Sequence, residues 1–369
     1  MRRVYLDWNA TTPPHPDVLT AMHDAPWGNP ASIHAAGREA RACVEEAREA
    51  TAAMCGVDAR DVVLTSGGTE ANNLALRSAF VEKGGTLALG RIEHPSIVKV
   101  AEALEREGRA RVRWLAVRES GDVDLVDLDR ALDEGGVRLV CVMAVNHETG
   151  VVQPIAEVAE RVHAKKAMLH VDAVQAWSKI EVRPVFDTAS VGAHKMRGPK
   201  GIGALATRPG VKIAPVLLGG SQEKGIRPGT VDAVLAAGLG ACARRAKSNI
   251  APHARIAALR DALESGLAAL GGRPMGNPSR RVAHVSLCTW PGWVGAELVA
   301  ALDLEGVCVS SGAACSAGTV EPSPVLTAML GDDSLAAAGV RCSLGDETTT
   351  DDIELAVAAF GKVLARAPR

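Results

Sequence analysis

Two residues in the middle of the chain, Asp172 and Lys195, are the first candidates for chemistry. Asp172 ends an apolar run that begins at Met168, and a carboxylate at the end of a buried strand needs a partner. Lys195 follows on a tight connection, between His194 and a turn at residues 198–201. The two side chains could form a structural ion pair. They also offer what pyridoxal 5'-phosphate (PLP) requires, an acid for its pyridine nitrogen and an amine for a Schiff base.

A pair of glycines follows the apolar run at residues 62–64. Gly67 and Gly68 stand before a helical pattern, where backbone N–H groups and a helix N-terminus favour an anion such as phosphate. The segment lacks the GxxxxGK[ST] pattern of nucleoside-triphosphate loops. An ordinary helix start with Thr69 as its N-cap is the alternative.

Two further strand ends carry polar residues. His94 stands before a helix that opens at Pro95, and Asn146 begins a polar cluster after the apolar run at residues 137–144. A lone histidine in such a place is more often structural than functional. Functional groups in α/β sheets nevertheless collect at the carboxyl ends of strands, so the four strand ends together predict one site at that edge.

One cysteine differs from the others in its surroundings. Cys315 lies within residues 310–318, a run of serine, glycine and alanine that has almost no bulk to hold it in a core. An accessible thiol in such a loop is a candidate nucleophile. A small-residue loop with an incidental cysteine is the alternative.

Composition excludes several classes of function. The 369 residues carry a formal net charge of -2, with no long run of one sign, so no nucleic-acid surface is expected. No apolar run is long enough to predict a membrane span. The eight cysteines form no CxxC pair and no Cys/His ligand spacing, which argues against a metal site or a disulfide framework. We therefore expect a globular cytoplasmic protein.

Short apolar runs that alternate with helical patterns predict an α/β fold. The strand-like runs cover residues 62–64, 86–89, 137–144, 168–171 and 202–206, and their continuous hydrophobicity fits a parallel sheet that helices cover on both faces. Helical patterns cover residues 71–83, 95–106 and 154–166. The regular alternation of strand-like and helical segments ends after about residue 250. We expect a large domain at residues 12–250 and a smaller α+β domain from residues 1–11 and 251–369.

Together these segments resemble the cysteine desulfurase family, within the aspartate-aminotransferase-like fold (fold type I) of PLP-dependent transferases. The matching segments run nearly from end to end: residues 5–13, 28–32, 65–72, 93–94, 146–150, 170–175, 194–195, 198–203, 227–230, 310–315 and 341–345. Each segment alone is weak evidence for the family, whereas all of the segments in this order are specific to it.

The resemblance implies a role for each matching residue. Toward PLP it implies Lys195 as the Schiff-base amine, Asp172 at the pyridine nitrogen, Gln175 at the ring hydroxyl, His94 stacked on the ring, and Asn146. Toward the phosphate it implies Gly68, Thr69 and His194, with Thr230 from the other subunit of a homodimer. Toward the substrate it implies Arg341, Asn146 and Asn29. Cys315 is then the nucleophile, and His94 is a candidate proton shuttle.

The implied reaction takes sulfur from L-cysteine, leaving L-alanine and a persulfide on Cys315 that passes to a sulfur-acceptor protein. The long segment between Cys315 and Arg341 is similar to the family branch that serves iron–sulfur assembly and tRNA thiolation. Three positions depart from the common pattern: Gly192 replaces a serine, His147 replaces a second asparagine, and Val231 stands where glutamate is frequent. Selenocysteine lyase, another β-lyase or aminotransferase of this fold, and a non-catalytic scaffold are the alternatives.

Overall fold

The computed structural model describes residues 2–311 and 321–366. Cys315 therefore lies outside the described residues. Among those described, no helix is both long enough and apolar enough to cross a membrane.

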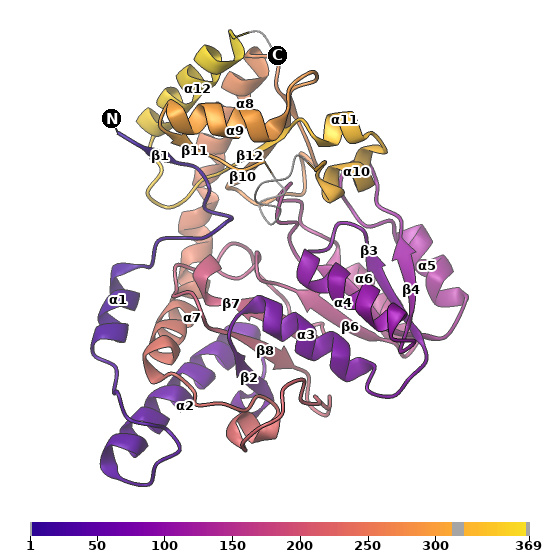
Figure 1. Cartoon of the computed structure of the whole chain (residues 1–369), viewed down its shortest axis with the longest axis vertical. Helices are drawn as coiled ribbons and strands as arrows, with labels where there is room; N and C mark the ends of the chain where they lie inside the picture. Colours follow the sequence, from indigo (N-terminus) through magenta and orange to yellow (C-terminus); the bar gives the residue numbers. More distant parts are fainter. Residues whose placement is uncertain (1, 312–320, 367–369) are drawn as a thin grey trace.

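A seven-stranded sheet forms the centre of the larger part of the molecule (Figure 1). Its strand order is β2-β8-β7-β6-β5-β3-β4, and β8 alone runs against the others. The strands are β2 (Val62–Thr65), β3 (Thr86–Gly90), β4 (Arg111–Leu115), β5 (Val137–Met143), β6 (Met168–Asp172), β7 (Thr188–Gly192) and β8 (Gly203–Thr207). The predicted α/β class with a mainly parallel sheet is confirmed.

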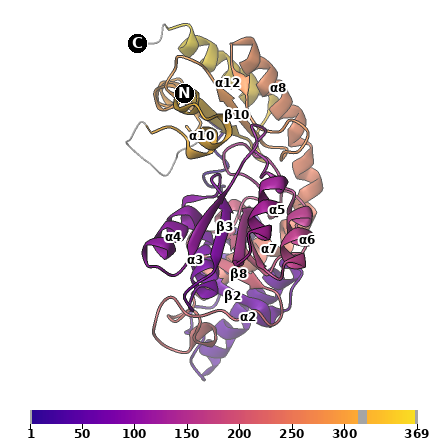
Figure 2. The same ribbon diagram turned by 90° about the vertical axis from the view of Figure 1, so that its right-hand side faces the viewer.

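Helices cover both faces of this sheet, as Figure 2 shows. One face carries α3 (Gly68–Ala79) and α4 (Pro95–Arg106). The other carries α2 (Ala35–Cys55), α5 (Leu125–Asp133), α6 (Ile155–Ala164) and α7 (Ala233–Ala254), while α1 (Pro16–His23) packs on α7. In β5, Val140 and Val142 join one apolar cluster, and Leu139 and Cys141 join the other. A strand buried on both faces is apolar throughout, which explains the continuous hydrophobic runs.

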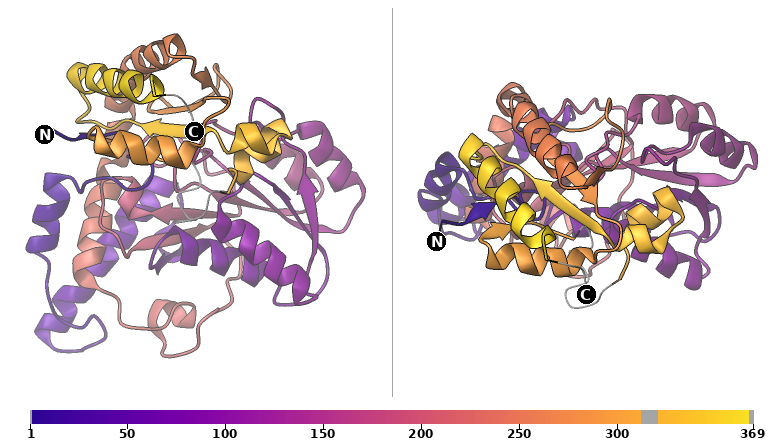
Figure 3. Two further views of the ribbon diagram at one scale, coloured as in Figure 1. Left: turned by 45° about the horizontal axis from the view of Figure 1, so that its top comes forward. Right: turned by 90° about the horizontal axis from the view of Figure 1, so that it is seen from above.

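A separate group of elements gathers at one end of the molecule, next to the N-terminal strand β1 (Val4–Tyr5) (Figure 3). It contains α8 (Ile256–Ala269), β9 (Arg273–Pro274), β10 (Val285–Thr289), α9 (Gly295–Leu304), β11 (Val307–Cys308), α10 (Pro324–Leu330), α11 (Asp333–Ala336), β12 (Gly339–Ser343) and α12 (Thr350–Leu364). β10 pairs with β9 and β12 in an antiparallel sheet, and β1 pairs with β11. Val4 and Leu6 share one apolar cluster with residues of α8, α9 and α12. This cluster supports our proposed division into residues 12–250 and the remainder.

Candidate active site

The carboxyl ends of neighbouring strands bring the predicted polar residues to one edge of the sheet. Asp172 ends β6, and the short helix η2 (Ala193–Lys195) follows β7 directly. His94 follows β3, and His147 lies in the turn after β5. Because β7, β6, β5 and β3 are consecutive in the sheet, residues far apart in the sequence share one edge.

The carboxylate of Asp172 is buried and held by three donors. Its oxygens accept from Asn72 Nδ2 at 2.8 Å, from Ser190 Oγ at 3.1 Å and from the backbone N–H of Val174 at 3.1 Å. His170 and Asp172 alternate with Leu169 and Val171 along β6, so both face α3 and its Asn72. These bonds fix the direction in which the carboxylate points.

His170 supports the carboxylate through Asn72. Its Nε2 lies 3.0 Å from Asn72 Oδ1, and its Nδ1 lies 2.8 Å from the hydroxyl of Thr188. Burial lowers the pKa of His170 to about 4, so the ring is neutral at pH 7. The neutral tautomer that suits both contacts donates from Nε2 and accepts at Nδ1.

Lys195 is held by the N-terminal segment. Its Nζ donates to the carbonyl oxygen of Asn9 at 2.5 Å and to that of Ala10 at 2.9 Å. The carbonyl of Asn9 also accepts from Gln175 Nε2 at 3.0 Å. Gln175 in turn accepts from the buried amine of Lys179 at 2.7 Å. Asn9 thus links the amine of Lys195 to Gln175, one of the predicted cofactor residues.

The helix start at α3 fits a phosphate group. Its N-cap is Gly67, which has no side chain to satisfy the first N–H groups, so they remain suited to an anion. The alternative with Thr69 as N-cap is wrong, because Thr69 lies inside the helix. Burial, together with the charges of Lys195 and Lys200, lowers the pKa of His194 to about 4. His194 is therefore a neutral hydrogen-bonding group, and its Nδ1 lies 3.2 Å from Thr11 Oγ1.

His94 caps the next helix along the edge. Its Nδ1 accepts from the backbone N–H of Ser96 at 3.1 Å, which leaves Nε2 to carry the proton of the neutral ring. Burial lowers the pKa of His94; the charge of Asp172 opposes this shift and that of Lys195 adds to it. The predicted PLP residues Asp172, Lys195, Gln175 and His94 therefore share one edge of the sheet with an uncapped helix start. This set fits PLP.

Arg341 lies on β12 with its side chain 3% exposed. Its Nη1 donates to the carbonyl of His147 at 2.8 Å, and its Nη2 pairs with Asp7 at 2.7 Å. Its Nε–H has no partner among the described residues. A guanidinium has five N–H donors, so Arg341 keeps capacity for a substrate carboxylate.

Three other predicted residues lie in different surroundings. Asn146 is fully buried, and its amide bonds to the carbonyl of Ile92 and to the N–H groups of Glu148 and Thr149, which stabilises the turn after β5. Asn29 is exposed and accepts from Ala31 in its own turn. Thr230 is exposed on the segment before α7. Within one chain, the structure does not bring Asn29 or Thr230 to the edge where Asp172 and Lys195 lie.

Comparison with known proteins identifies the family. The model of "Aminotransferase class-V" matches residues 4–355. A cysteine desulfurase IscS of Dechloromonas aromatica is 39% identical over 96% of this chain and 90% of its own. A cysteine desulfurase of Nostoc is 36% identical over 99% of this chain and 94% of its own. A solved NifS-like protein, 32% identical, superposes with a TM-score of 0.92 and covers 99% of this chain and all of its own.

The chain belongs to the cysteine desulfurase family. Gly192 is the position at which the family resemblance led us to expect a serine. A Cβ built on Gly192 would lie 3.2 Å from Val174 Cγ1 and 3.8 Å from the backbone nitrogen of Gly68. Val174 therefore crowds the position at which a serine would stand beside the proposed phosphate site.

We expect the double variant Gly192→Ser/Val174→Ala to retain PLP more tightly than Val174→Ala alone. One added hydrogen bond is worth about 0.5–1.5 kcal/mol, or roughly 2- to 12-fold in the dissociation constant. Equilibrium dialysis against PLP measures the change, with Gly192→Ala/Val174→Ala as the control that adds Cβ without the hydroxyl. Equal affinity of the serine and alanine double variants would show that the hydroxyl reaches no phosphate oxygen.

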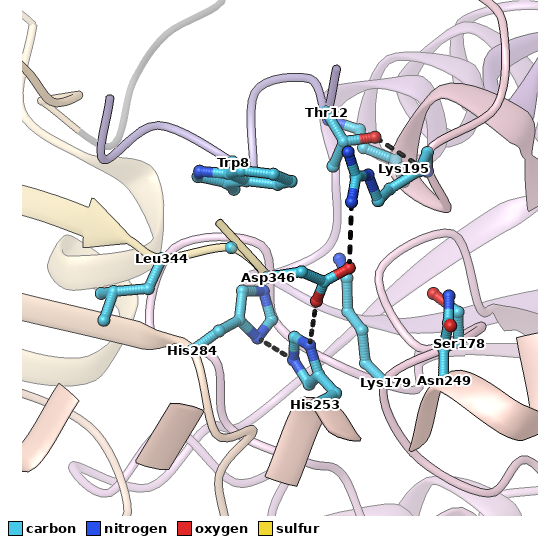
Figure 4. A pocket seen from close by; sticks show the side chains of 12 residues that line it. Trp8, Thr12, Ser178, Lys179, Lys195, Asn249, His253, His284, Leu344 and Asp346 are labelled. Carbon is cyan, nitrogen blue, oxygen red and sulfur yellow. Dashed lines mark hydrogen bonds and ion pairs between the residues drawn. The ribbon is translucent and has the colours of Figure 1, made fainter. Parts of the chain in front are cut away.

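A small cavity of about 30 Å³ adjoins Lys195 in this family member. That volume is about enough for one or two water molecules. Figure 4 shows His253, which lines the cavity, between His284 and Asp346, with a dashed line to each. His253 Nε2 lies 3.0 Å from His284 Nδ1, and His284 Nε2 lies 2.8 Å from Asn9 Oδ1. This network supports Asn9, which holds Lys195.

Sequence reasoning did not single out Asn9, Asn72, Lys179 or His284. Asn9 and Asn72 stand in segments that carry the family resemblance, which was the available signal. Burial lowers the pKa of Lys179 to about 7, but no pattern in its neighbouring residues indicates that burial. His284 directly precedes β10, and only the folding of the chain brings it into contact with Asn9.

Proposed function

We propose that the protein removes sulfur from L-cysteine with PLP bound at Lys195, giving L-alanine and a persulfide on Cys315. The observation that carries the proposal is the placement of Asp172 and Lys195 at the ends of adjacent strands, beside an uncapped helix start. That combination supplies an acid, an amine and an anion site at one edge of a sheet. A family member with these groups has the equipment for PLP chemistry on an amino acid.

Each neighbouring side chain has a proposed task. Asp172 holds the proton on the pyridine nitrogen, Gln175 contacts the ring hydroxyl, and His94 packs on the ring. Gly68, Thr69 and His194 hold the phosphate, with Thr230 from a second copy of the chain. When bound, PLP supplies a ring that withdraws electrons and makes the Cα proton of the amino acid acidic.

The residues of the chain perform the remaining steps. Arg341 binds the carboxylate of L-cysteine through its fork of N–H groups. The amine of Lys195 removes the Cα proton. The thiolate of Cys315 attacks the substrate sulfur, so that an S–S bond forms while the Cβ–S bond breaks. The electron pair of the broken bond ends in a C–H bond of alanine after protonation at Cβ, for which His94 is the proposed proton shuttle.

Elimination also supports Cys315 as the nucleophile. Burial raises the thiol pKa of every cysteine in the described residues: Cys43, Cys55, Cys141, Cys242, Cys288, Cys308 and Cys342. Because the thiolate is the reactive form, these seven are poor nucleophiles at neutral pH. Cys315 is the remaining cysteine of the eight.

We further propose a cytoplasmic homodimer that passes its sulfur to an acceptor protein of iron–sulfur assembly or thiolation. Trp27 is 89% exposed and Ile33 86% exposed in the segment between α1 and α2. Leu218 is 90% exposed in the segment before α7. Large apolar side chains in such positions suit an interface, and the same two segments carry Asn29 and Thr230. In a homodimer, Asn29 and Thr230 of one copy would be able to reach the active site of the other copy.

A spectrum of the purified protein tests the function. We expect a visible absorbance band after reconstitution with PLP, a change of that band on addition of L-cysteine, and release of alanine with persulfide on the protein. Lys195→Ala is the control without the covalent link. Turnover of L-cysteine and L-selenocysteine, measured side by side, separates a desulfurase from a selenocysteine lyase. A reconstituted protein with no visible band would contradict the proposal and favour a scaffold.

A further inference from the structure

His147 stands where the family resemblance led us to expect a second asparagine, and the structure places its ring beside that of His94. The ring meets that of His94 edge to face, with centroids 5.3 Å apart and planes at 77°. Its backbone carbonyl accepts from Arg341 Nη1 at 2.8 Å and from Asn9 Nδ2 at 3.1 Å. Two residues of the site thus fix the backbone from which the imidazole projects.

The imidazole of His147 has an unused nitrogen. Its side chain is 17% exposed, yet Nδ1 is buried and has no hydrogen-bond partner among the described residues. Its Nε2 lies 3.6 Å from Glu148 Oε1, and Glu148 is tied to Ser323 Oγ at 2.5 Å. A buried nitrogen without a partner is costly, so a ligand group at Nδ1 would offset that cost.

The protonation of the two rings follows from their contacts. Burial lowers the pKa of His147 well below its usual value, and the nearby cations Arg341 and Lys195 lower it further. The neutral ring donates from one nitrogen and accepts at the other. With Nε2–H toward Glu148, Nδ1 is an acceptor. His94, whose Nδ1 is used by Ser96, presents an Nε2–H donor, so the two rings offer complementary groups.

The three polar groups of L-cysteine can be assigned in turn. The carboxylate suits Arg341, and the amine is the group that PLP, held at Lys195, would bind. A separate binding site for the amine as an ammonium group would be unfavourable beside Arg341 and Lys195, because both of these side chains are cations. The thiol is the remaining polar group, and it is neutral.

We propose that His147 Nδ1 accepts a hydrogen bond from the thiol of bound L-cysteine, which makes His147 a specificity-determining residue. The inference rests on the proposed function and extends it to the recognition of the side chain. His147 then distinguishes L-cysteine from L-alanine, which has the same carboxylate and amine but no thiol.

Binding titrations test the proposal in a Cys315→Ser background, where sulfur transfer is blocked. The visible PLP band reports the dissociation constants of L-cysteine and L-alanine separately. His147→Leu removes the acceptor and should weaken L-cysteine roughly 2- to 10-fold, with L-alanine unchanged. His147→Asn, whose side-chain oxygen can stand near the position of Nδ1, should recover most of the loss.

Other results overturn the inference. If the variant binds both amino acids more weakly to the same degree, His147 acts on the carboxylate or the cofactor. If it binds both as tightly as the parent does, His147 contacts no part of the ligand. If His147→Leu fails to fold, the smaller His147→Ala provides the same comparison. A parent protein that forms no visible band with PLP would overturn the proposed function itself, and this inference with it.

Discussion

A chain carrying Lys195→Ala should fold, form no covalent link to PLP and release no alanine from L-cysteine. The amine lies at the end of β7, where the carbonyls of Asn9 and Ala10 hold it, and it has two proposed tasks, attachment of PLP and removal of the Cα proton. Losing a group of this kind costs roughly 1,000-fold or more in rate. Borohydride reduction and peptide mass spectrometry of the wild type should find the adduct on Lys195.

Lys179 provides a demanding control, because it lines the same small cavity as Lys195. Its pKa, lowered to about 7 by burial and by the charge of Lys195, leaves much of the amine unprotonated at neutral pH, the form that attacks carbonyls. The amine is instead tied to Gln175 at 2.7 Å. Lys179→Met should therefore retain the covalent adduct on Lys195. An adduct on Lys179 in the wild type would reverse the assignment.

The fold class and the edge that carries the site were predictable from strand periodicity. The runs at β2, β3, β5, β6 and β8 are mostly apolar because most residues on both faces of each strand are buried. β7 was missed because Thr-Ala-Ser-Val-Gly contains few large apolar residues. β4 was missed because arginines interrupt it at the end of the sheet, where a strand tolerates charge. Helix α3 begins three residues before the predicted range because Gly67 starts it.

The site itself was predictable only as a set of strand ends. The polar cluster at residues 146–150 indicated a functional turn, but the turn geometry decides which side chain faces the site. Asn146 bonds inward to Ile92, Glu148 and Thr149, so His147 points to His94 instead. The support of Lys195 by Asn9 depends on contacts between residues 186 positions apart, and no local pattern encodes such contacts.

Both ends of the segment that carries Cys315 are anchored beside the proposed substrate groups. Ser310 exchanges two backbone hydrogen bonds with Arg341, at 2.7 and 3.1 Å. Ser323 donates to Glu148, next to His147, at 2.5 Å. Arg341 and His147 are the residues proposed to hold the carboxylate and the thiol of L-cysteine. The anchors therefore start and end the Cys315 segment next to the substrate whose sulfur the thiolate would attack.

Cys315→Ser should keep the folded protein and its PLP band, and should lose production of alanine and persulfide by roughly 1,000-fold or more. Serine is a far weaker nucleophile toward sulfur than a thiolate, whereas the groups proposed to bind L-cysteine (Arg341, His147 and the cofactor) are unchanged. The band should therefore still respond to L-cysteine. Cys308→Ser is the matched control, because Cys308 is partly exposed just before the same segment and its pKa is raised by burial. It should keep most of the activity. If Cys315→Ser releases alanine at the wild-type rate, no persulfide forms on Cys315, and a β-lyase reaction takes the place of sulfur transfer.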